Sequence, residues 1–202
     1  EHEVVAVLTR PDAGSGRGRR VRQSPVAVAA ERAGIQTLKP TSLRDPDIQT
    51  WLEALDIDAA PVIAFGALVP PELLAVPTHG WVNLHFSLLP AWRGAAPVQR
   101  AIMAGDEITG ATTFQLAQGL DTGPMLGRVT ETVRTTDTAG DVLGRLSQAG
   151  AHLLVASLDA LAAGTAQPQA QPSEGISHAP KLSVEDAEID WTRPAYAVDR
   201  QI

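Results

Sequence analysis

Cysteine is absent from the 202 residues, which excludes disulfide bonds, thiolate metal ligands and cysteine nucleophiles. Long apolar runs are lacking too, since none reaches the roughly 18 residues of a membrane-spanning helix, and no signal peptide is visible. Positive charge is scarce, with 16 Lys and Arg against 23 Asp and Glu and a formal net charge of −7. We therefore expect a cytoplasmic protein with no membrane partner, and the total charge does not indicate a nucleic-acid partner.

Short apolar runs alternate with helix signals along most of the chain. With 44% hydrophobic residues, the composition is that of a globular protein with one large domain or one domain and an appendage. We predict strands within residues 3–8, 35–40, 60–66, 81–86, 108–117 and 123–133, and helices within 25–33, 45–56, 96–104 and 138–163. This alternation is typical of the α/β class, with an open, mostly parallel, Rossmann-like sheet and helices on both faces. The last two strands share a short connection, which favours antiparallel pairing.

Two stretches have the composition of loops. Residues 9–23 contain Pro, Asp and three Gly, and they are predicted to form a long loop. Residues 164–175 are polar and rich in Pro, as in a surface segment or linker, and a short element and an amphipathic helix are predicted after them.

The strand "WVNLHF" ends in two polar residues, Asn83 and His85, which share one face because strand side chains alternate. Leu84 takes the opposite face, toward the core. Ligands of open α/β sheets bind beyond the carboxyl ends of the strands, where this pair is expected. The alternative is that both side chains only bond loop backbone.

Asp121, in the Gly-flanked turn "GLDTG", follows another predicted strand. A carboxylate beside an imidazole orients the ring and stabilises its charged form, although Asp121 could equally be a turn-former. No nucleophile elbow surrounds Ser87, "GSGRG" is not a dinucleotide fingerprint, and the remaining His residues lack metal-ligand spacing, so no metal is expected. The remaining chemistry is an amide that orients, an imidazole that transfers a proton and a carboxylate that tunes it.

The stretch "NLHFSLLPAWRGAAPVQRAI", followed by "GLDTGPM", resembles the folate-dependent formyltransferases. The shared features are Asn83, His85, the turn from Ser87 to Pro90, and Asp121. Within this family, "WRGAAPVQRAI" and "RPDAGSGRGRR" are similar to the branch that acts on methionyl-tRNA, and the resemblance covers nearly the whole chain.

The resemblance implies transfer of a formyl group from 10-formyltetrahydrofolate to the amino group of charged initiator Met-tRNA, by a monomer without a metal. Asn83 and His85 would stabilise the developing oxyanion, and Asp121 would keep His85 charged or oriented. The implied folate contacts are Phe65, Gly66, Leu68, Ser87, Leu88, Pro90, Ala117, Gln118 and Leu120. The implied tRNA contacts are Arg17, Arg19, Arg20, Arg22 and Arg93.

The resemblance also implies a domain plan. Residues 1–180 would form the formyltransferase catalytic domain, and residues 181–202 a linker and helix. The family has one more strand and helix ahead of "EHEVVAVL" and a β-barrel domain after the last residues of this chain.

Alternatives remain open at this point. One is a related formyltransferase with a small amine acceptor, an amino-sugar nucleotide or glycinamide ribonucleotide, and the arginine-rich loop is evidence against it. Another is a non-catalytic RNA-binding module, which has no need of Asn83, His85 and Asp121 together. The arginines could also be a solvated charge run, and Phe65 and Leu68 could be ordinary core residues.

Overall fold

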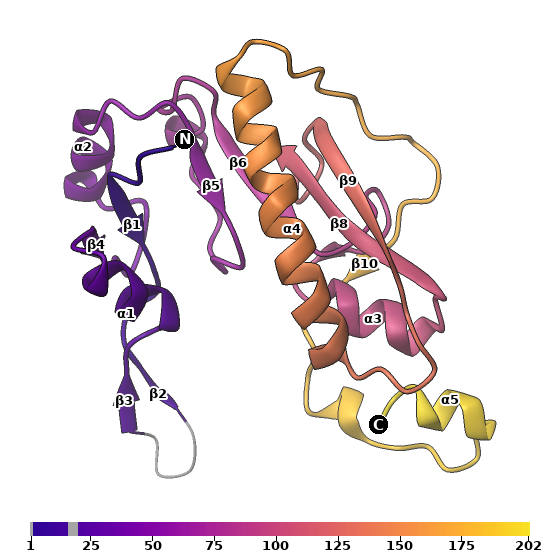
Figure 1. Cartoon of the computed structure of the whole chain (residues 1–202). Helices are drawn as coiled ribbons and strands as arrows, with labels where there is room; N and C mark the ends of the chain where they lie inside the picture. The colour runs from indigo at the N-terminus through magenta and orange to yellow at the C-terminus, as the bar shows by residue number, and fades with distance from the viewer. Residues whose placement is uncertain (1, 16–19) are drawn as a thin grey trace. The chain divides into compact units, whose positions relative to one another are not determined.

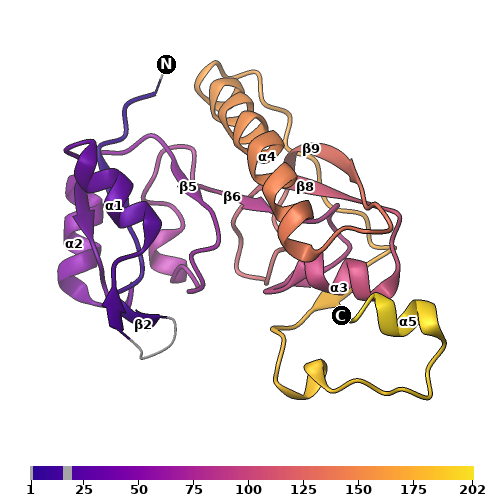
Figure 2. The same ribbon diagram turned by 60° about the horizontal axis from the view of Figure 1, so that its bottom comes forward.

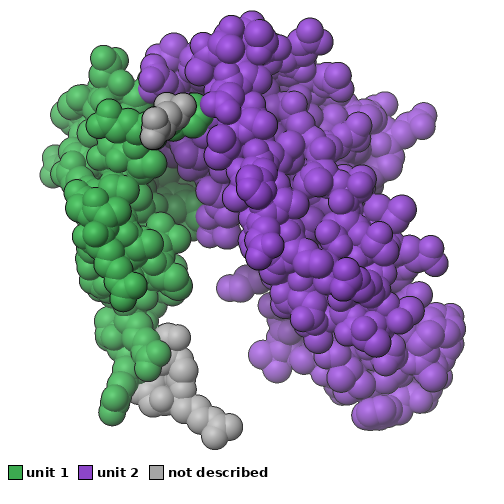
Figure 3. Space-filling model, viewed as in Figure 1, with its two compact units in different colours: residues 1–57, 65–76 green, residues 58–64, 77–202 purple. Residues whose placement is uncertain are grey.

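The computed structural model describes residues 2–15 and 20–202. It divides into two compact units, the first comprising Glu1–Ile57 and Phe65–Val76 and the second Asp58–Ala64 and Pro77–Ile202 (Figure 3). Strands and helices alternate in both units, so the predicted α/β class is confirmed.

The first unit is built on two parallel strands, β1 (Ala6–Leu8) and β4 (Gln36–Leu38). Its helices are α1 (Pro25–Arg32), α2 (Pro46–Ala54) and the 3-10 turn η1 (Pro71–Leu73). The start of α1 is the predicted one, because the Ser24 hydroxyl accepts a hydrogen bond from Ala27 N at 3.1 Å. The buried apolar side chains of this unit are Ala27, Ala30, Leu43, Leu52 and Leu73.

The long loop predicted over residues 9–23 is wrong in part, because the stretch contains a hairpin. Strand β2 (Ala13–Ser15) pairs antiparallel with β3 (Arg20–Arg22). All three residues of β3 are exposed, so backbone hydrogen bonds rather than an apolar face define these strands. Hydrophobic periodicity gives no signal for such a hairpin.

The second unit contains a four-stranded sheet in the order β5 (Ala60–Val62), β6 (Trp81–His85), β8 (Ile108–Gln115), β9 (Met125–Thr132). Strands β5 and β6 are parallel, and β8 is antiparallel to both β6 and β9, so this sheet is mixed. The predicted antiparallel pairing of the last two strands is confirmed. The connection through β7 (Arg93–Gly94) and α3 (Pro97–Ala104) returns to the end at which β6 stops, so β8 runs back beside it.

Helix α4 (Ala139–Ala162) lies along one face of this sheet (Figures 1 and 2). Leu84 packs there, as predicted, in a core with Val82, Val98, Ala111, Val142, Leu146, Leu154 and Leu161. The helix comes close at Gly150, where an added Cβ would lie 2.9 Å from Leu84 Cδ2. Since Leu84 is directed to α4, its neighbours Asn83 and His85 are directed to the other face, where Leu89, Phe114 and Met125 form a second core cluster.

The segment after α4, residues 164–180 and hereafter the return segment, runs back along the sheet to β10 (His178–Ala179) (Figure 1). Gln169 and Met125 exchange two backbone hydrogen bonds of 2.8 Å, and β10 pairs parallel with β7. The predicted surface segment is therefore bound to the sheet by backbone hydrogen bonds. The 3-10 turn η2 (Glu185–Ala187) and α5 (Ala195–Asp199) follow, and no helix among the described residues has the length and apolarity needed to span a membrane.

Candidate functional site

His85 is the last residue of β6, and its side chain is 7% exposed. Its Nε2 lies 2.8 Å from the carbonyl oxygen of Trp92. A carbonyl only accepts, so Nε2 carries a hydrogen and Nδ1 is the ring atom left to gain or lose a proton. Nδ1 lies 3.8 Å from Oδ2 of Asp121, within ion-pair range but too far for a direct hydrogen bond. The Phe114 ring packs edge-on against the imidazole, with the ring centroids 6.5 Å apart.

Both residues that face the imidazole nitrogens have left-handed backbone, with φ of 60° at Trp92 and 51° at Asp121. This conformation costs a non-glycine residue about 1–2 kcal/mol, so neighbouring contacts must maintain it. The indole of Trp92 donates to Asp106 Oδ2 at 2.7 Å, and its backbone N–H donates to Ser177 Oγ at 2.9 Å. These two bonds direct the Trp92 carbonyl at His85.

Asp121 is held from β7, because the N–H of Gly94 donates to its Oδ2 at 2.8 Å. Gly94 has a φ of 127°, and an added Cβ would lie 2.6 Å from the carbonyl oxygen of Ala179. Only glycine fits at this close approach of β7 and β10. The backbone of the Asp121 turn is held as well, since Gln171 donates to the carbonyl oxygens of Asp121 and Gly123.

Asn83 lies on the same strand face as His85 and is half-buried. Within residues 2–15 and 20–202 its carboxamide has no hydrogen-bond partner, so it is available to a substrate. The structure therefore brings His85 and Asp121 into ion-pair range and places Asn83 on their face of the sheet. No group of three metal-binding side chains occurs in the described part of the chain.

The turn after β6 is formed by buried polar contacts. Ser87 is fully buried, and its hydroxyl donates to the carbonyl oxygen of Ala91 at 2.6 Å. Thr112 Oγ1 donates to the Ser87 carbonyl at 2.7 Å and accepts from Leu89 N at 3.2 Å. The Leu89–Pro90 peptide bond is cis. Ser87 and Pro90, predicted folate contacts, are thus buried parts of the turn, whereas Leu88 is half-buried.

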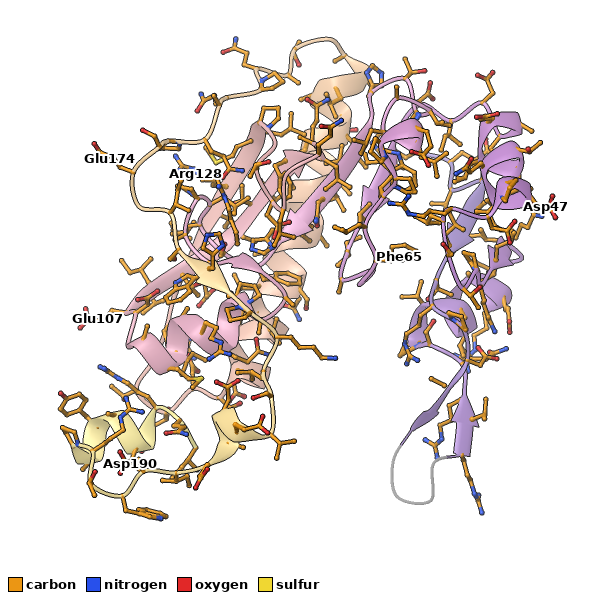
Figure 4. All side chains as sticks on the ribbon, turned by 180° about the vertical axis from the view of Figure 1, so that it is seen from behind. Asp47, Phe65, Glu107, Arg128, Glu174 and Asp190 are labelled. Atoms are coloured by element: carbon orange, nitrogen blue, oxygen red, sulfur yellow. The ribbon has the colours of Figure 1, made fainter. Side chains whose placement is uncertain are left out.

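The other predicted folate residues lie in exposed loops of the two units. Ala117, Gln118 and Leu120 are exposed between β8 and β9, and Leu120 is 54% exposed. In the first unit, Phe65 is half-buried (Figure 4) and Gly66 is exposed with a φ of 77°. Leu68 is 79% exposed, so it is not an ordinary core residue.

The arginines predicted to contact tRNA have different surroundings. Arg17 and Arg19 lie outside the described residues, whereas Arg20 and Arg22 are exposed on β3. Arg93 is half-buried, and its Nε and Nη2 donate to Gln171 Oε1 at 3.1 and 2.6 Å. The structure thus places Arg93 in the hydrogen-bond network around the Asp121 turn.

Sequence reasoning missed four residues that support this site, Gly94, Asp106, Gln171 and Ser177. Their contacts join positions up to 85 residues apart. Gln171 and Ser177 lie in a polar stretch without periodicity, so no local signal marks them.

Comparison with known proteins identifies the family. The formyl transferase family model matches residues 1–158. The chain is 60% identical over 201 residues to a methionyl-tRNA formyltransferase of Acidothermus cellulolyticus and 61% identical to that of Streptomyces coelicolor. Both alignments cover 100% of this chain but only 62% and 65% of those proteins, so the chain spans less than two thirds of their length.

A solved structure has the same fold. The N-formyltransferase of Helicobacter canadensis, in complex with folinic acid and dTDP-3-aminofucose, has a TM-score of 0.71 at 17% identity over 96% of this chain and 67% of that chain. The family model, the relatives and the shared fold agree, and this chain belongs to the formyl transferase family.

Proposed function

We propose that the chain is the catalytic part of a methionyl-tRNA formyltransferase. It would transfer a formyl group from 10-formyltetrahydrofolate to the amino group of charged initiator Met-tRNA. The observation that carries the proposal is identity of 60–61% across the whole chain with relatives of that name. The N-formyltransferase in complex with an amino-sugar nucleotide is only 17% identical, which disfavours a small amine acceptor.

The proposed reaction begins when the amine lone pair attacks the formyl carbon. Negative charge develops on the formyl oxygen, and donors aimed at that oxygen lower the barrier. The free carboxamide of Asn83 and a protonated Nδ1 of His85 supply such donors from one strand face. The bond from the formyl carbon to N10 of the folate then breaks; N10 gains a proton and the amine loses one.

Asp121 supports this step through His85. Its Oδ2 lies 3.8 Å from Nδ1, so a positive charge that forms on the ring has a carboxylate beside it. The hydrogen bond from Nε2 to Trp92 orients the ring, so that Nδ1 rather than Nε2 takes part in proton transfer. A non-catalytic RNA-binding module has no use for this arrangement.

The candidate substrate contacts are those that the family resemblance implies, and the exposure of each residue is compatible with or against a direct contact. Ala117, Gln118 and Leu120 offer apolar surface and loop backbone to the folate, and Leu88 is a further candidate. Phe65, Gly66 and Leu68 are candidate folate contacts on the first unit, whereas Ser87 and Pro90 would act by shaping the turn. Arg17, Arg19, Arg20, Arg22 and Arg93 are the candidate tRNA contacts, with phosphates as their partners. In this scheme residues 1–180 form the catalytic domain. The protein would be a monomer and would act in the cytoplasm.

Formyl release from 10-formyltetrahydrofolate is the test. The protein is incubated with the donor alone, with charged initiator Met-tRNA, with glycinamide ribonucleotide or with a dTDP-amino sugar. Release that depends on Met-tRNA supports the proposal. Release that depends on a small amine supports the alternative, and no release with any acceptor contradicts both.

A further inference from the structure

We infer that Gln171, on the return segment, is a positioning residue that holds the Asp121 turn in place for His85. The inference rests on the proposed function for its kinetic test and on geometry alone for its spectroscopic test. Gln171 touches no reacting atom in this scheme and acts through Asp121.

The carboxamide of Gln171 makes four hydrogen bonds. Its Nε2 donates to the carbonyl oxygens of Asp121 and Gly123, at 2.8 and 2.9 Å. Its Oε1 accepts from Nε and Nη2 of Arg93, at 3.1 and 2.6 Å. A guanidinium only donates and a carbonyl only accepts, so the orientation of the amide is unambiguous. Both hydrogens and both lone pairs of the carboxamide are therefore used.

These bonds close a ring around the Asp121 turn. Arg93 and Gly94 are consecutive residues of β7; Arg93 reaches the turn through Gln171, and Gly94 binds the Asp121 carboxylate directly at 2.8 Å. Backbone and side chain of Asp121 are thus held from one short strand. This matters because Asp121 has a φ of 51°, which it does not favour by itself.

Loss of the two hydrogen bonds that Gln171 Nε2 donates would release the Asp121 turn on the side of the return segment. The Asp121 carbonyl could rotate toward water, and the carboxylate would move with it relative to His85 Nδ1, which lies 3.8 Å away. A catalytic group displaced by a fraction of an ångström loses much of its effect. In metal sites, residues that orient a ligand in this indirect way typically account for about 10- to 100-fold of activity, and we expect a loss of the same order here.

Gln171→Ala is the main variant, and Gln169→Ala is its matched control. Gln169 lies two residues earlier in the same segment, its side chain is exposed, and it binds Met125 through backbone atoms only. We expect Gln171→Ala to lower kcat on Met-tRNA about 10- to 100-fold, with a smaller change in KM for the folate donor. Gln169→Ala should leave both constants unchanged. Equal constants for Gln171→Ala and wild type would overturn the inference.

Gln171→Glu tests the acceptor and the donor of the carboxamide separately. It retains an acceptor for Arg93 but places a carboxylate oxygen against the carbonyls of Asp121 and Gly123. If Gln171 acts through the turn, Gln171→Glu should be at least as slow as Gln171→Ala. If pairing with Arg93 is its whole role, Gln171→Glu should retain wild-type kcat, and the inference fails.

A double mutant tests the route through Asp121. In an Asp121→Asn background, Gln171→Ala should lower kcat by less than about threefold, because the group that it positions is already disabled. An undiminished loss in that background would show that Gln171 acts by another route and would overturn the inference.

The imidazole nitrogen resonances of His85 provide a readout independent of activity. Gln171→Ala should shift the Nδ1 signal, whereas Gln169→Ala should leave it in place. If wild-type protein fails to formylate Met-tRNA but the His85 signal shifts as expected, the proposed function fails and the positioning role stands. An unmoved signal in folded Gln171→Ala contradicts the positioning role.

Discussion

The imidazole of His85 and the carboxylate of Asp121 approach to 3.8 Å between Nδ1 and Oδ2, although 36 positions separate the residues in the sequence. Both side chains are at most 10% exposed. Since Nε2 is occupied by the Trp92 carbonyl, proton transfer in this site is restricted to the edge of the ring that Asp121 faces.

Asp121→Asn should lower kcat for Met-tRNA by roughly 100-fold, because charge that develops on His85 loses its carboxylate. Folate affinity should change less, since the amide oxygen can still accept the Gly94 hydrogen bond. Steady-state kinetics and equilibrium folate binding measure the two effects. Glu174→Gln, a neutralised carboxylate on the exposed part of the return segment (Figure 4), is the control and should behave as wild type. Wild-type turnover in Asp121→Asn would rule out its role.

Gly94→Ala should destabilise the fold by about 2 kcal/mol or more, because the new Cβ meets the Ala179 carbonyl at 2.6 Å in a left-handed backbone. Gly144→Ala is the matched control. Gly144 lies within α4, where an added Cβ has no neighbour within 4 Å, so alanine should stabilise the helix by about 0.5–1 kcal/mol. Denaturant unfolding measures both, and equal effects of the two substitutions would contradict the close approach of β7 and β10.

Acid stability should depend on Asp137. Hydrogen bonds from Arg145 lower the pKa of Asp137 from its ordinary 3.8 to about 2. A carboxyl whose folded pKa lies below its unfolded pKa stabilises the fold above the unfolded value, and the contribution is lost as the pH falls from about 4 to 2. Asp137→Asn should therefore lower the unfolding temperature at pH 6 and converge with wild type near pH 2.

The control for this pH dependence is Glu107→Gln, which neutralises an exposed carboxylate immediately before β8 (Figure 4). Its unfolding temperature should follow the wild-type curve at every pH. A constant difference between Asp137→Asn and wild type down to pH 2 would show that the substitution acts by something other than titration.

Replacement of Arg17, Arg19 and Arg20 by Ala should weaken Met-tRNA binding and reduce its dependence on salt. Each phosphate contact contributes roughly 0.7–0.9 to the log–log salt slope, so three lost contacts should flatten it by up to about two or three units. Folate affinity should hardly change. If tRNA kinetics and salt slope both stay at wild-type values, the arginines are a solvated charge run.

Local chemistry in the sequence was enough to predict most helices and one half of the site. Helices α1 and α4 begin within one residue of the predicted positions, with Ser24 and Thr138 as their N-caps, and Gly105 ends α3 in a left-handed turn. Strand alternation alone predicts that Leu84 is directed to the core and that Asn83 and His85 share the other face. These features depend on neighbours within about four residues, which the sequence displays directly.

The other half of the site depends on the tertiary structure. In the folded chain Asp121 faces Nδ1 of His85 and the Trp92 carbonyl binds Nε2. Gln171 joins Arg93 to the Asp121 turn. These contacts join residues 7 to 78 positions apart in the sequence. The left-handed backbones of Trp92 and Asp121 run against local preference. Hydrogen bonds from distant residues hold them: Asp106 and Ser177 bind Trp92, and Gly94 and Gln171 bind Asp121. The hairpin of β2 and β3 likewise depends on cross-strand hydrogen bonds. Local propensity does not predict such pairings, because the stabilising contacts form between chain segments that meet only after folding.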